Sequence, residues 1–333
     1  MEAPVGFVHN NSFYEDELYN EGSKAEESQT QVLIIFSVVI LLSLIGNILV
    51  VVISVFYMRL RSLTIIFILN LALSDLLSTV VPLFWVCDYI WGLTLGDAVC
   101  KVVDFIDSTG FYSSIMFLVL MSIQRYMARV HPLSGWKKGR CFTLVLVCAW
   151  LVSMLAAVPV TVHAEAYPDS RHCMYSSITA LVALMYERHI VFVCAFLVMA
   201  FCYIRILQTI FKSPTNQKHR TTALAFFLVA TFFICWAPYN IVNFIWLLDY
   251  QIGFYNQVLE HLYYAKYICG LLAATQCCLN PVIYGLFGVK FRKTVREIFQ
   301  RRAFNFAQMR MVELHSGSFV NLNNQVPELD IKT

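Results

Sequence analysis

The chain has 333 residues, of which 59% are hydrophobic and only 14% are charged, and its formal net charge is +3. Soluble globular domains average about 25% charged residues, and this composition supplies too little polar surface for one. It therefore excludes an ordinary soluble protein and predicts a chain embedded in a membrane.

Residues 1–30 differ from the rest of the chain because they are polar and acidic. They contain seven acidic residues and one lysine, so this arm carries a net charge of −6 and the remainder of the chain +9. They include no apolar stretch typical of a cleavable signal peptide. We expect a disordered extracellular arm that attracts cationic partners, although a merely solubilising tail would have the same composition. The sequence Asn10-Asn11-Ser12 is a glycosylation sequon, which makes Asn10 a candidate glycosylation site.

Seven apolar segments follow, and each is long enough to cross the hydrocarbon core of a bilayer, which takes about 20 residues. They lie near residues 31–57, 64–87, 99–123, 141–162, 190–211, 221–248 and 262–286. Basic residues concentrate after the first, third, fifth and seventh segments, which places those sides in the cytoplasm and the N-terminus outside. The predicted fold is an all-α membrane protein, a seven-transmembrane helix bundle over residues 31–286.

An apolar stripe continues beyond the seventh segment at helical spacing, among basic residues. It consists of Phe287, Phe291, Val295, Ile298 and Phe299. The pattern predicts a short amphipathic helix over residues 287–302 that lies on the membrane lipid. Residues 303–333 form the predicted cytoplasmic tail, which has three hydroxyl side chains and therefore offers little phosphorylation for arrestin capture.

Most of the eleven cysteines lie inside the apolar segments, where a cysteine is usually a small buried hydrophobic residue. Cys100 lies at the outer mouth of the third segment and Cys173 in the loop between the fourth and fifth. Because that compartment is oxidising, we expect a disulfide between them. Cys87 and Cys269, near the outer ends of the second and seventh segments, are expected to stay unpaired.

Four polar residues lie at mid-membrane depth: Asn47, Asp75, Ser114 and Asn280. Each is costly in hydrocarbon unless it meets another polar group, so we expect them to converge on a hydrated pocket. Asp75 would favour a small cation there, such as an allosteric sodium ion. No other cofactor and no further metal site is expected.

Arg125 ends the third segment in the run Gln124-Arg125-Tyr126. A guanidinium at the end of a membrane helix is usually paired or functional, yet its neighbour Gln124 is neutral. Pro238 and Pro281 each remove a backbone hydrogen bond and kink the sixth and seventh segments. Such kinks serve equally well as hinges or as static packing features.

These motifs, in this order, resemble the rhodopsin-like (class A) G-protein-coupled receptors over residues 31–302. The resembling segments are Gly46-Asn47, Leu71-Ala72-Leu73-Ser74-Asp75, Cys235-Trp236-Ala237-Pro238 and Asn280-Pro281-Val282-Ile283-Tyr284. The resemblance implies that Trp236, packed with Phe232, is the toggle residue beneath the ligand. It also implies that Tyr203 and Tyr284 meet Arg125 when the sixth span swings outward and a G protein enters.

Within the class, the chain resembles the chemokine receptors, and its pattern is closest to the XC-type (lymphotactin) members. The resembling segments include Leu95-Gly96-Asp97-Ala98-Val99-Cys100-Lys101, Cys277-Cys278-Leu279-Asn280-Pro281 and Gly288-Val289-Lys290-Phe291-Arg292. The resemblance implies a plasma-membrane receptor for a basic chemokine that activates an inhibitory-type heterotrimeric G protein in chemotaxis and calcium signalling. It implies neither an enzyme nor a nucleic-acid partner. Tyr14 and Tyr19, among acidic residues, resemble the family's sulfated tyrosines, which bind Arg and Lys of the ligand.

The chain departs from the family where a ligand-anchoring glutamate is expected, because Gly270 stands there. Asp107 precedes Arg125 by 18 residues, or roughly 27 Å of helix, and so lies in the outer third of the bundle. Our hypothesis is that Asp107 anchors the cationic N-terminus of a chemokine, which enters near Trp85, Asp104 and Tyr267. The alternative is local neutralisation of these acids by nearby lysines, and the candidates are Lys101 and Lys266.

The neutral Gln124 leaves the output open between a signalling receptor and an atypical, scavenging one. Relatives mostly carry an aspartate there, and losing its charge weakens the restraint on Arg125. We favour signalling, because residues 127–133 keep the length and the Pro-Leu pair that dock G protein in relatives. Asp107 alone would also suit an amine or another cationic peptide, but residues 191–196 offer no serine pair for an amine. A membrane enzyme or transporter is disfavoured, since we find no HExxH motif, phosphate loop or inverted repeat.

Overall fold

The structure, a computed structural model, describes residues 33–58, 62–91, 96–131, 140–166, 173–212, 219–252, 258–288 and 291–302, with residues 304 and 308. The acidic arm with Asn10, Tyr14 and Tyr19 lies outside the described residues, as does most of the tail. The predictions made for those segments stay predictions.

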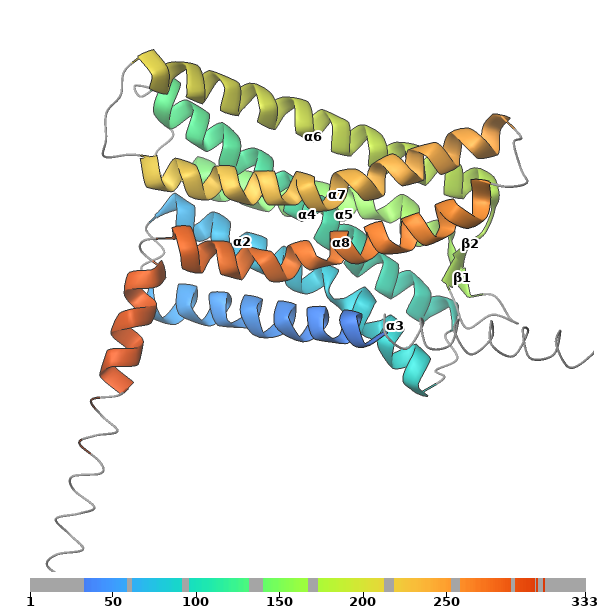
Figure 1. The fold of residues 1–333 in the computed structure, drawn as a ribbon, viewed down its shortest axis with the longest axis horizontal. Coiled ribbons are helices and arrows are strands. Elements are labelled where there is room, and N and C mark those ends of the chain that lie inside the picture. The colour runs from blue at the N-terminus through green and yellow to red at the C-terminus, as the bar shows by residue number, and fades with distance from the viewer. Residues whose placement is uncertain are drawn as a thin grey trace, which may run out of the picture.

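Within the described residues, seven helices are long and apolar enough to cross a membrane, which confirms the predicted bundle (Figure 1). The first span, Leu33–Tyr57, ends in the π-helical turn η1 (Ile53–Tyr57). The remaining elements are α2 (Leu63–Ser78), α3 (Val80–Trp91), α4 (Asp97–Val130), α5 (Arg140–His163), β1 (Ala164–Ala166), β2 (Cys173–Tyr175), α6 (Ile178–Lys212), α7 (His219–Ile252) and α8 (Val258–Phe287). A short helix over residues 291–302 follows α8.

The bundle is polar inside and apolar outside, as expected when lipid takes the place of water. Ile45 and Leu155 are 65% and 69% exposed, whereas Asn47 and Asp75 are fully buried. Polar groups cannot be solvated by hydrocarbon, so they turn inward and the large apolar side chains face the lipid. The described spans therefore have the surface of a membrane protein.

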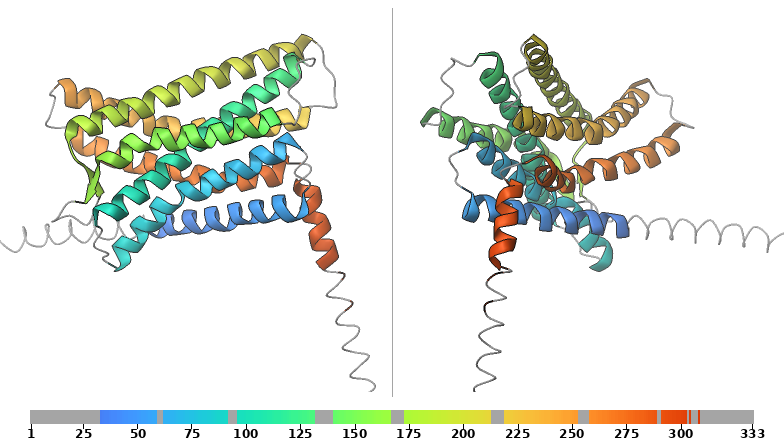
Figure 2. Two further views of the ribbon diagram at one scale, coloured as in Figure 1. Left: turned by 180° about the vertical axis from the view of Figure 1, so that it is seen from behind. Right: turned by 60° about the vertical axis from the view of Figure 1, so that its left-hand side comes forward.

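Helix α4 lies at the centre of the bundle, where it packs against α2, α3, α5, α6 and α7 (Figure 2). Phe117, Leu118 and Met121 on this helix are fully buried. Asp97 occupies the first turn of α4, where a negative charge interacts favourably with the helix N-terminus. Its Oδ1 also accepts a hydrogen bond of 2.7 Å from the backbone N–H of Ala166 in β1.

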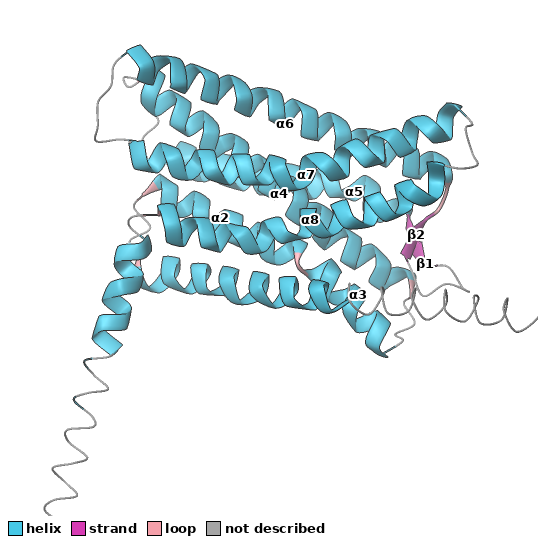
Figure 3. Cartoon of the chain, viewed as in Figure 1, coloured by secondary structure: helices cyan, strands magenta, loops and turns pink. Residues whose placement is uncertain are grey.

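A two-stranded antiparallel hairpin of β1 and β2 covers one end of the bundle, which we call the hairpin end (Figure 3). A disulfide between Cys100 and Cys173 joins β2 to the start of α4, and this confirms the predicted bridge. Cys87 and Cys269 are free, as expected. We call the opposite end, where α4 finishes, the Arg125 end.

The second span is broken, although the sequence predicted one continuous helix over residues 64–87. α2 ends at Ser78 and α3 begins at Val80, because Pro82 has no N–H to offer the ladder. Gly110 of α4 packs against this break: a Cβ there would lie 2.7 Å from the backbone nitrogen of Ser78. Only glycine permits so close an approach of the two backbones.

Two further boundaries differ from the prediction. α6 begins at Ile178 rather than near residue 190, and α4 continues to Val130 rather than ending near residue 123. In both places the extra turns carry charged side chains, which hide helical segments from a search for apolar runs. The helix over residues 291–302 turns away from the axis of α8 at the Arg125 end, as a helix on the membrane surface would (Figure 1).

Candidate functional site

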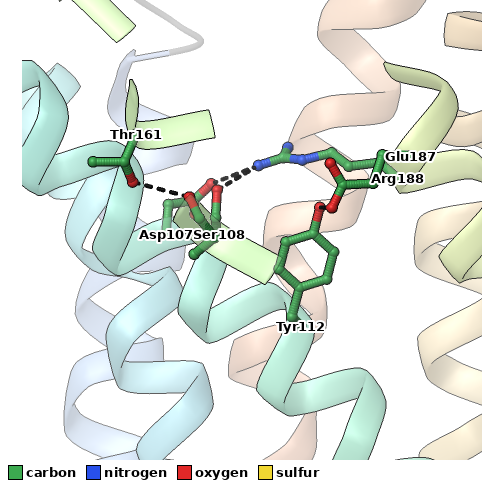
Figure 4. A network of polar contacts seen from close by, with 7 residues as sticks. Asp107, Ser108, Tyr112, Thr161, Glu187 and Arg188 are labelled. Atoms are coloured by element: carbon green, nitrogen blue, oxygen red, sulfur yellow. Dashed lines mark hydrogen bonds and ion pairs between the residues drawn. The ribbon is translucent and has the colours of Figure 1, made fainter. Parts of the chain in front are cut away.

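Near the hairpin end, Asp107 of α4 forms an ion pair with Arg188 of α6 (Figure 4). Arg188 Nη2 lies 3.8 Å from Asp107 Oδ2, and it also donates a hydrogen bond of 3.0 Å to Ser108 Oγ. The side chains of Arg188 and Asp107 are 27% and 29% exposed. The pair is therefore neither sealed in the core nor fully solvated.

The residues on either side of this ion pair extend the contact between α4 and α6. The guanidinium carbon of Arg188 lies 5.4 Å from the centroid of the Phe111 ring, a cation–π contact. The next residue of α4, Tyr112, donates its hydroxyl to Glu187 Oε1 at 3.3 Å. Two consecutive charged residues of α6 are thus held by one face of α4 (Figure 4).

Asp104 and Tyr175 complete this group at the hairpin end. Asp104 interacts electrostatically with both Asp107 and Arg188. Tyr175 lies on β2, outside the spans, where burial raises the pKa of its hydroxyl and the Arg188 cation opposes that rise. The hairpin therefore brings a phenol to the same charged group. The group combines acidic side chains with a single arginine, an arrangement that can bind a cation.

The structure brings together two of the predicted ligand residues, Asp104 and Asp107. The backbones of Trp85 and Tyr267 lie in α3 and α8, but their side chains lie outside the described residues. The cation that contacts Asp107 is Arg188, which was not among the lysine candidates, and Lys266 lies over the ring of Trp246, 5.4 Å from its centroid. Neutralisation of Asp104 by Lys101 stays a prediction.

A continuous series of aromatic contacts leads from Arg188 toward the middle of the bundle. Phe111, beneath Arg188, contacts Trp236 of α7 with ring centroids 4.8 Å apart. Trp236 in turn stacks on the fully buried Phe232 at 6.0 Å. Trp236 precedes Pro238, which interrupts the α7 ladder. Two side-chain contacts, Arg188–Phe111 and Phe111–Trp236, therefore connect Arg188 to the predicted toggle residue.

The predicted mid-membrane residues form a buried polar layer. Asn280 Nδ2 donates to Asp75 Oδ2 at 2.7 Å, and Ser114 interacts with the same carboxyl group. Asn47 joins the layer through the backbone, because its Nδ2 donates to the backbone oxygen of Cys277 at 2.9 Å. Pro281, the second predicted kink, packs against Gly46 of the first span.

Three buried oxygens of this layer have no hydrogen-bond partner among the described residues: Asp75 Oδ1, Asn47 Oδ1 and Asn280 Oδ1. Hard cations are bound by such oxygens, so the residues fit a sodium ion. The described part of the chain contains no cluster of three His, Cys, Asp or Glu side chains that could hold another metal.

At the opposite end of α4, Arg125 is buried and donates from Nη2 to Thr64 Oγ1 of α2. Gln124 Oε1 is buried without a hydrogen-bond partner, so the neighbour of Arg125 does not restrain it in the described structure. The hydroxyl of Tyr284 is likewise buried and unpaired among the described residues. The buried hydroxyl of Tyr203 interacts with Ser122 and with the Arg125 cation. Tyr126 Oη lies 3.1 Å from His131 Nε2 in a hydrogen bond at the end of the helix.

Comparison with known proteins agrees with this geometry. The family described as 7 transmembrane receptor (rhodopsin family) matches residues 46–284. Chemokine XC receptor 1 of Homo sapiens is 39% identical over 276 residues, covering 80% of this chain and 81% of the relative. The chain belongs to the chemokine receptor family. The receptor is also similar to Chemokine XC receptor 1 of Mus musculus, at 39% identity over 82% of this chain and 84% of the relative. C-C chemokine receptor type 1 of Homo sapiens is 34% identical, over 80% of this chain and 79% of the relative.

The receptor has a second contact at the Arg125 end that sequence reasoning missed. Arg129 donates to Thr222 Oγ1 of α7, from Nη2 at 3.2 Å and from Nε at 3.3 Å. Phe227 of α7 stacks on Phe287 of α8, with centroids 4.0 Å apart and ring planes 18° from parallel. Both contacts hold the Arg125 end of α7 against the rest of the receptor.

Arg188 and Glu187 are the other functional candidates that the sequence reasoning missed. A signal was present, because adjacent opposite charges within a membrane helix are unusual. The apolar run predicts a fifth span that begins near residue 190, and this boundary leaves both charges in a loop. Their contacts with α4 became visible only in the folded receptor.

Proposed function

We propose that this receptor lies in the plasma membrane with its hairpin end outside, binds a basic chemokine and activates an inhibitory-type heterotrimeric G protein. Chemotaxis and calcium signalling would be the result. The observation that carries the proposal is the uninterrupted series of contacts from Asp107 through Arg188 and Phe111 to Trp236. It links an acidic site near the hairpin end to the helix that must move for G-protein entry.

Recognition begins at the acidic arm, where Tyr14 and Tyr19 would bind basic residues of the chemokine. The chemokine N-terminus then enters the bundle, and its ammonium group binds Asp107 near Asp104. Trp85 and Tyr267 would line the entrance. Because Asp107 is 29% exposed, the ammonium can reach it, but it has to compete with Arg188 for the carboxylate.

Activation is a shift between two populations, which the ligand drives by binding one of them more tightly. Displacing Arg188 alters its contact with Phe111 and so the packing around Trp236 and Phe232. The Arg125 end of α7 then swings outward about Pro238. Arg125 leaves Thr64 and turns toward the buried hydroxyls of Tyr203 and Tyr284, which opens the site for the G protein.

The second candidate is an atypical receptor that binds chemokine without strong G-protein coupling. The unpartnered Gln124 Oε1 is the observation that favours it, because relatives with an aspartate have a charged restraint at that place. Signalling remains the better supported reading. Arg125 is still held by Thr64, and α7 is still closed by Arg129 and Thr222, so the receptor retains restraints that a ligand can release.

A panel of recombinant chemokines, led by lymphotactin, tests both candidates when binding, G-protein activation and internalisation are scored on the same cells. Binding with G-protein activation supports the signalling receptor. Binding followed by internalisation alone supports the atypical receptor. Activation by small amines, with no chemokine of the panel bound, would overturn the proposal.

A further inference from the structure

The Arg188 guanidinium is only partly engaged by its ion pair. Its ion pair with Asp107 and its hydrogen bond to Ser108 both run through the single nitrogen Nη2, and among the described residues the guanidinium also interacts with the hydroxyls of Tyr112 and Tyr175. A guanidinium has five N–H donors in a planar fork that fits a carboxylate with two parallel hydrogen bonds. At 3.8 Å the contact with Asp107 is longer than such a bond, and the Nε side of the fork takes no part in it.

Ligand binding at Asp107 would leave this arginine without its counter-ion. If an ammonium group takes the carboxylate, the Arg188 cation stays in the bundle, lying against the Phe111 ring. An uncompensated charge in such surroundings is strongly destabilising. A ligand that brings only a cation therefore pairs with Asp107 and leaves Arg188 without a counter-ion.

A ligand that brings a cation and an anion together avoids this penalty. We propose that Arg188 is the binding subsite for a carboxylate in the N-terminal segment of the chemokine, beside the ammonium group held by Asp107. This inference rests on the proposed function, because it assumes that the chemokine N-terminus enters the bundle.

The short distance between the two charges limits where the ligand carboxylate is found. Arg188 Nη2 lies 3.8 Å from Asp107 Oδ2, and this distance is close to the length of one extended residue. An aspartate or glutamate within the first few residues of the chemokine can therefore reach Arg188 while the amino terminus stays on Asp107. The subsite selects ligands by the pair of charges and not by basic charge alone.

Two neighbouring contacts prepare the subsite. Tyr112 donates to Glu187, which keeps this adjacent carboxylate occupied. The Phe111 ring supports the guanidinium and touches Trp236, so a carboxylate that draws Arg188 away also changes the contact next to the toggle. The ligand's acidic residue thus contributes to activation as well as to affinity.

The test is a double-mutant cycle between receptor and ligand. The probe is the chemokine that binds most tightly in the panel and has Asp or Glu in its N-terminal segment, compared with its Asn or Gln version. On the unmodified receptor, neutralising that residue should weaken binding roughly ten- to a hundredfold, the range for hydrogen bonds to charged groups. On the Arg188→Gln receptor, the same ligand change should have almost no effect.

An Arg188 that merely neutralises Asp107 gives a different result. In that case Arg188→Gln changes the affinity of both ligand versions by the same factor, which overturns the subsite. The subsite is also overturned if the tight-binding chemokines all lack an N-terminal acidic residue. Failure of every chemokine to bind the unmodified receptor instead overturns the proposed function, so the two failures are distinguishable.

Control variants separate recognition from folding. Arg188→Lys keeps the charge and loses the fork, so it should retain only part of the coupling. Arg205→Gln changes an arginine on the same helix, far from Asp107, and should bind both ligand versions like the unmodified receptor. If Arg188→Gln does not reach the cell surface, the comparison between the unmodified and Arg188→Lys receptors still tests the subsite. Neutralising the ligand's acidic residue should then cost the unmodified receptor more affinity than it costs the Arg188→Lys receptor. Equal losses of affinity would overturn the subsite.

Discussion

Arg129 and Thr222 are joined by hydrogen bonds of 3.2 and 3.3 Å that link the last turn of α4 to the first turn of α7. Thr222 is buried, so its hydroxyl has little water to replace this partner. The donor is a guanidinium, and hydrogen bonds to charged groups are the stronger ones. This contact opposes the movement of α7 that the proposed mechanism requires.

Thr222→Val keeps the shape of the side chain and removes the hydroxyl. If the lost bond shifts the equilibrium by about 1 kcal/mol, ligand-independent G-protein activation should rise roughly fivefold. Thr222→Ser keeps a hydroxyl and should behave like the unmodified receptor. The measurement is basal G-protein activation at matched surface expression, and equal activity of the two variants would show that the contact is not a restraint.

Asp107→Asn removes the proposed anchor of the ligand ammonium and leaves Arg188 without its partner. We expect chemokine potency to fall at least about tenfold, since a charge-assisted contact is lost. Glu165→Gln removes an exposed acid of the hairpin and serves as the matched control, with potency expected to change little. Potency and efficacy unchanged by Asp107→Asn, at normal surface expression, would rule out the anchor.

Gln124→Asp places a carboxylate beside Arg125 and should draw the guanidinium from Thr64 into a charge-assisted pair. We expect lower basal activity and a severalfold higher chemokine concentration for half-maximal G-protein activation. If the variant leaves both basal and ligand-driven signalling unaltered, position 124 has no bearing on the output of this receptor.

Gly110→Ala should destabilise the receptor, because the new methyl group would overlap Ser78, whose backbone nitrogen lies 2.7 Å from the Cβ position. Overpacking of this kind typically costs about 1–3 kcal/mol. Gly285→Ala is the control, since nothing lies within 4 Å of its Cβ position. Thermal unfolding of the purified receptor should show a lower midpoint for Gly110→Ala only. Equal midpoints would mean that α4 and α2 can move apart to accept the methyl group without loss of stability.

Sodium should raise the unfolding midpoint of the receptor if the unpaired oxygens of Asp75, Asn47 and Asn280 bind it. An ion that binds only the folded state stabilises it, by roughly 2 °C for each kcal/mol of binding, the lower end of the range for proteins of 150–250 residues. Choline chloride at the same ionic strength provides the reference. Asp75→Asn should abolish the difference between the two salts, and a difference that persists in this variant would place the ion elsewhere.

The seven spans and the disulfide could be predicted because each depends on one property of the chain. Lipid demands long apolar segments, and an oxidising compartment favours pairing of the cysteines it contains. The depth of Asp107 followed from the helical rise alone, and the structure indeed brings it to the hairpin end beside Asp104.

The side-chain partners could not be predicted in the same way, because they depend on how each helix is rotated about its axis. Nothing local in the sequence says that Arg188 faces Asp107, or that Arg125 reaches Thr64 instead of Gln124. The same holds for the break after Ser78, which needs the close approach of Gly110 as well as Pro82. Rotation and approach are set by packing among all the helices, so they appear only in the assembled bundle.

The stacked rings of Phe227 and Phe287 would lower the ligand-independent activity of the receptor. Any outward swing of α7 has to slide these nearly parallel rings apart, which forfeits an aromatic contact of about 0.5–1.5 kcal/mol before a G protein can compensate for it. The free-energy cost of separating two uncharged phenylalanine rings changes little with salt or with pH. A receptor with the neutral Gln124 beside its arginine therefore has a hydrophobic contact that opposes the outward swing of α7 without any charge.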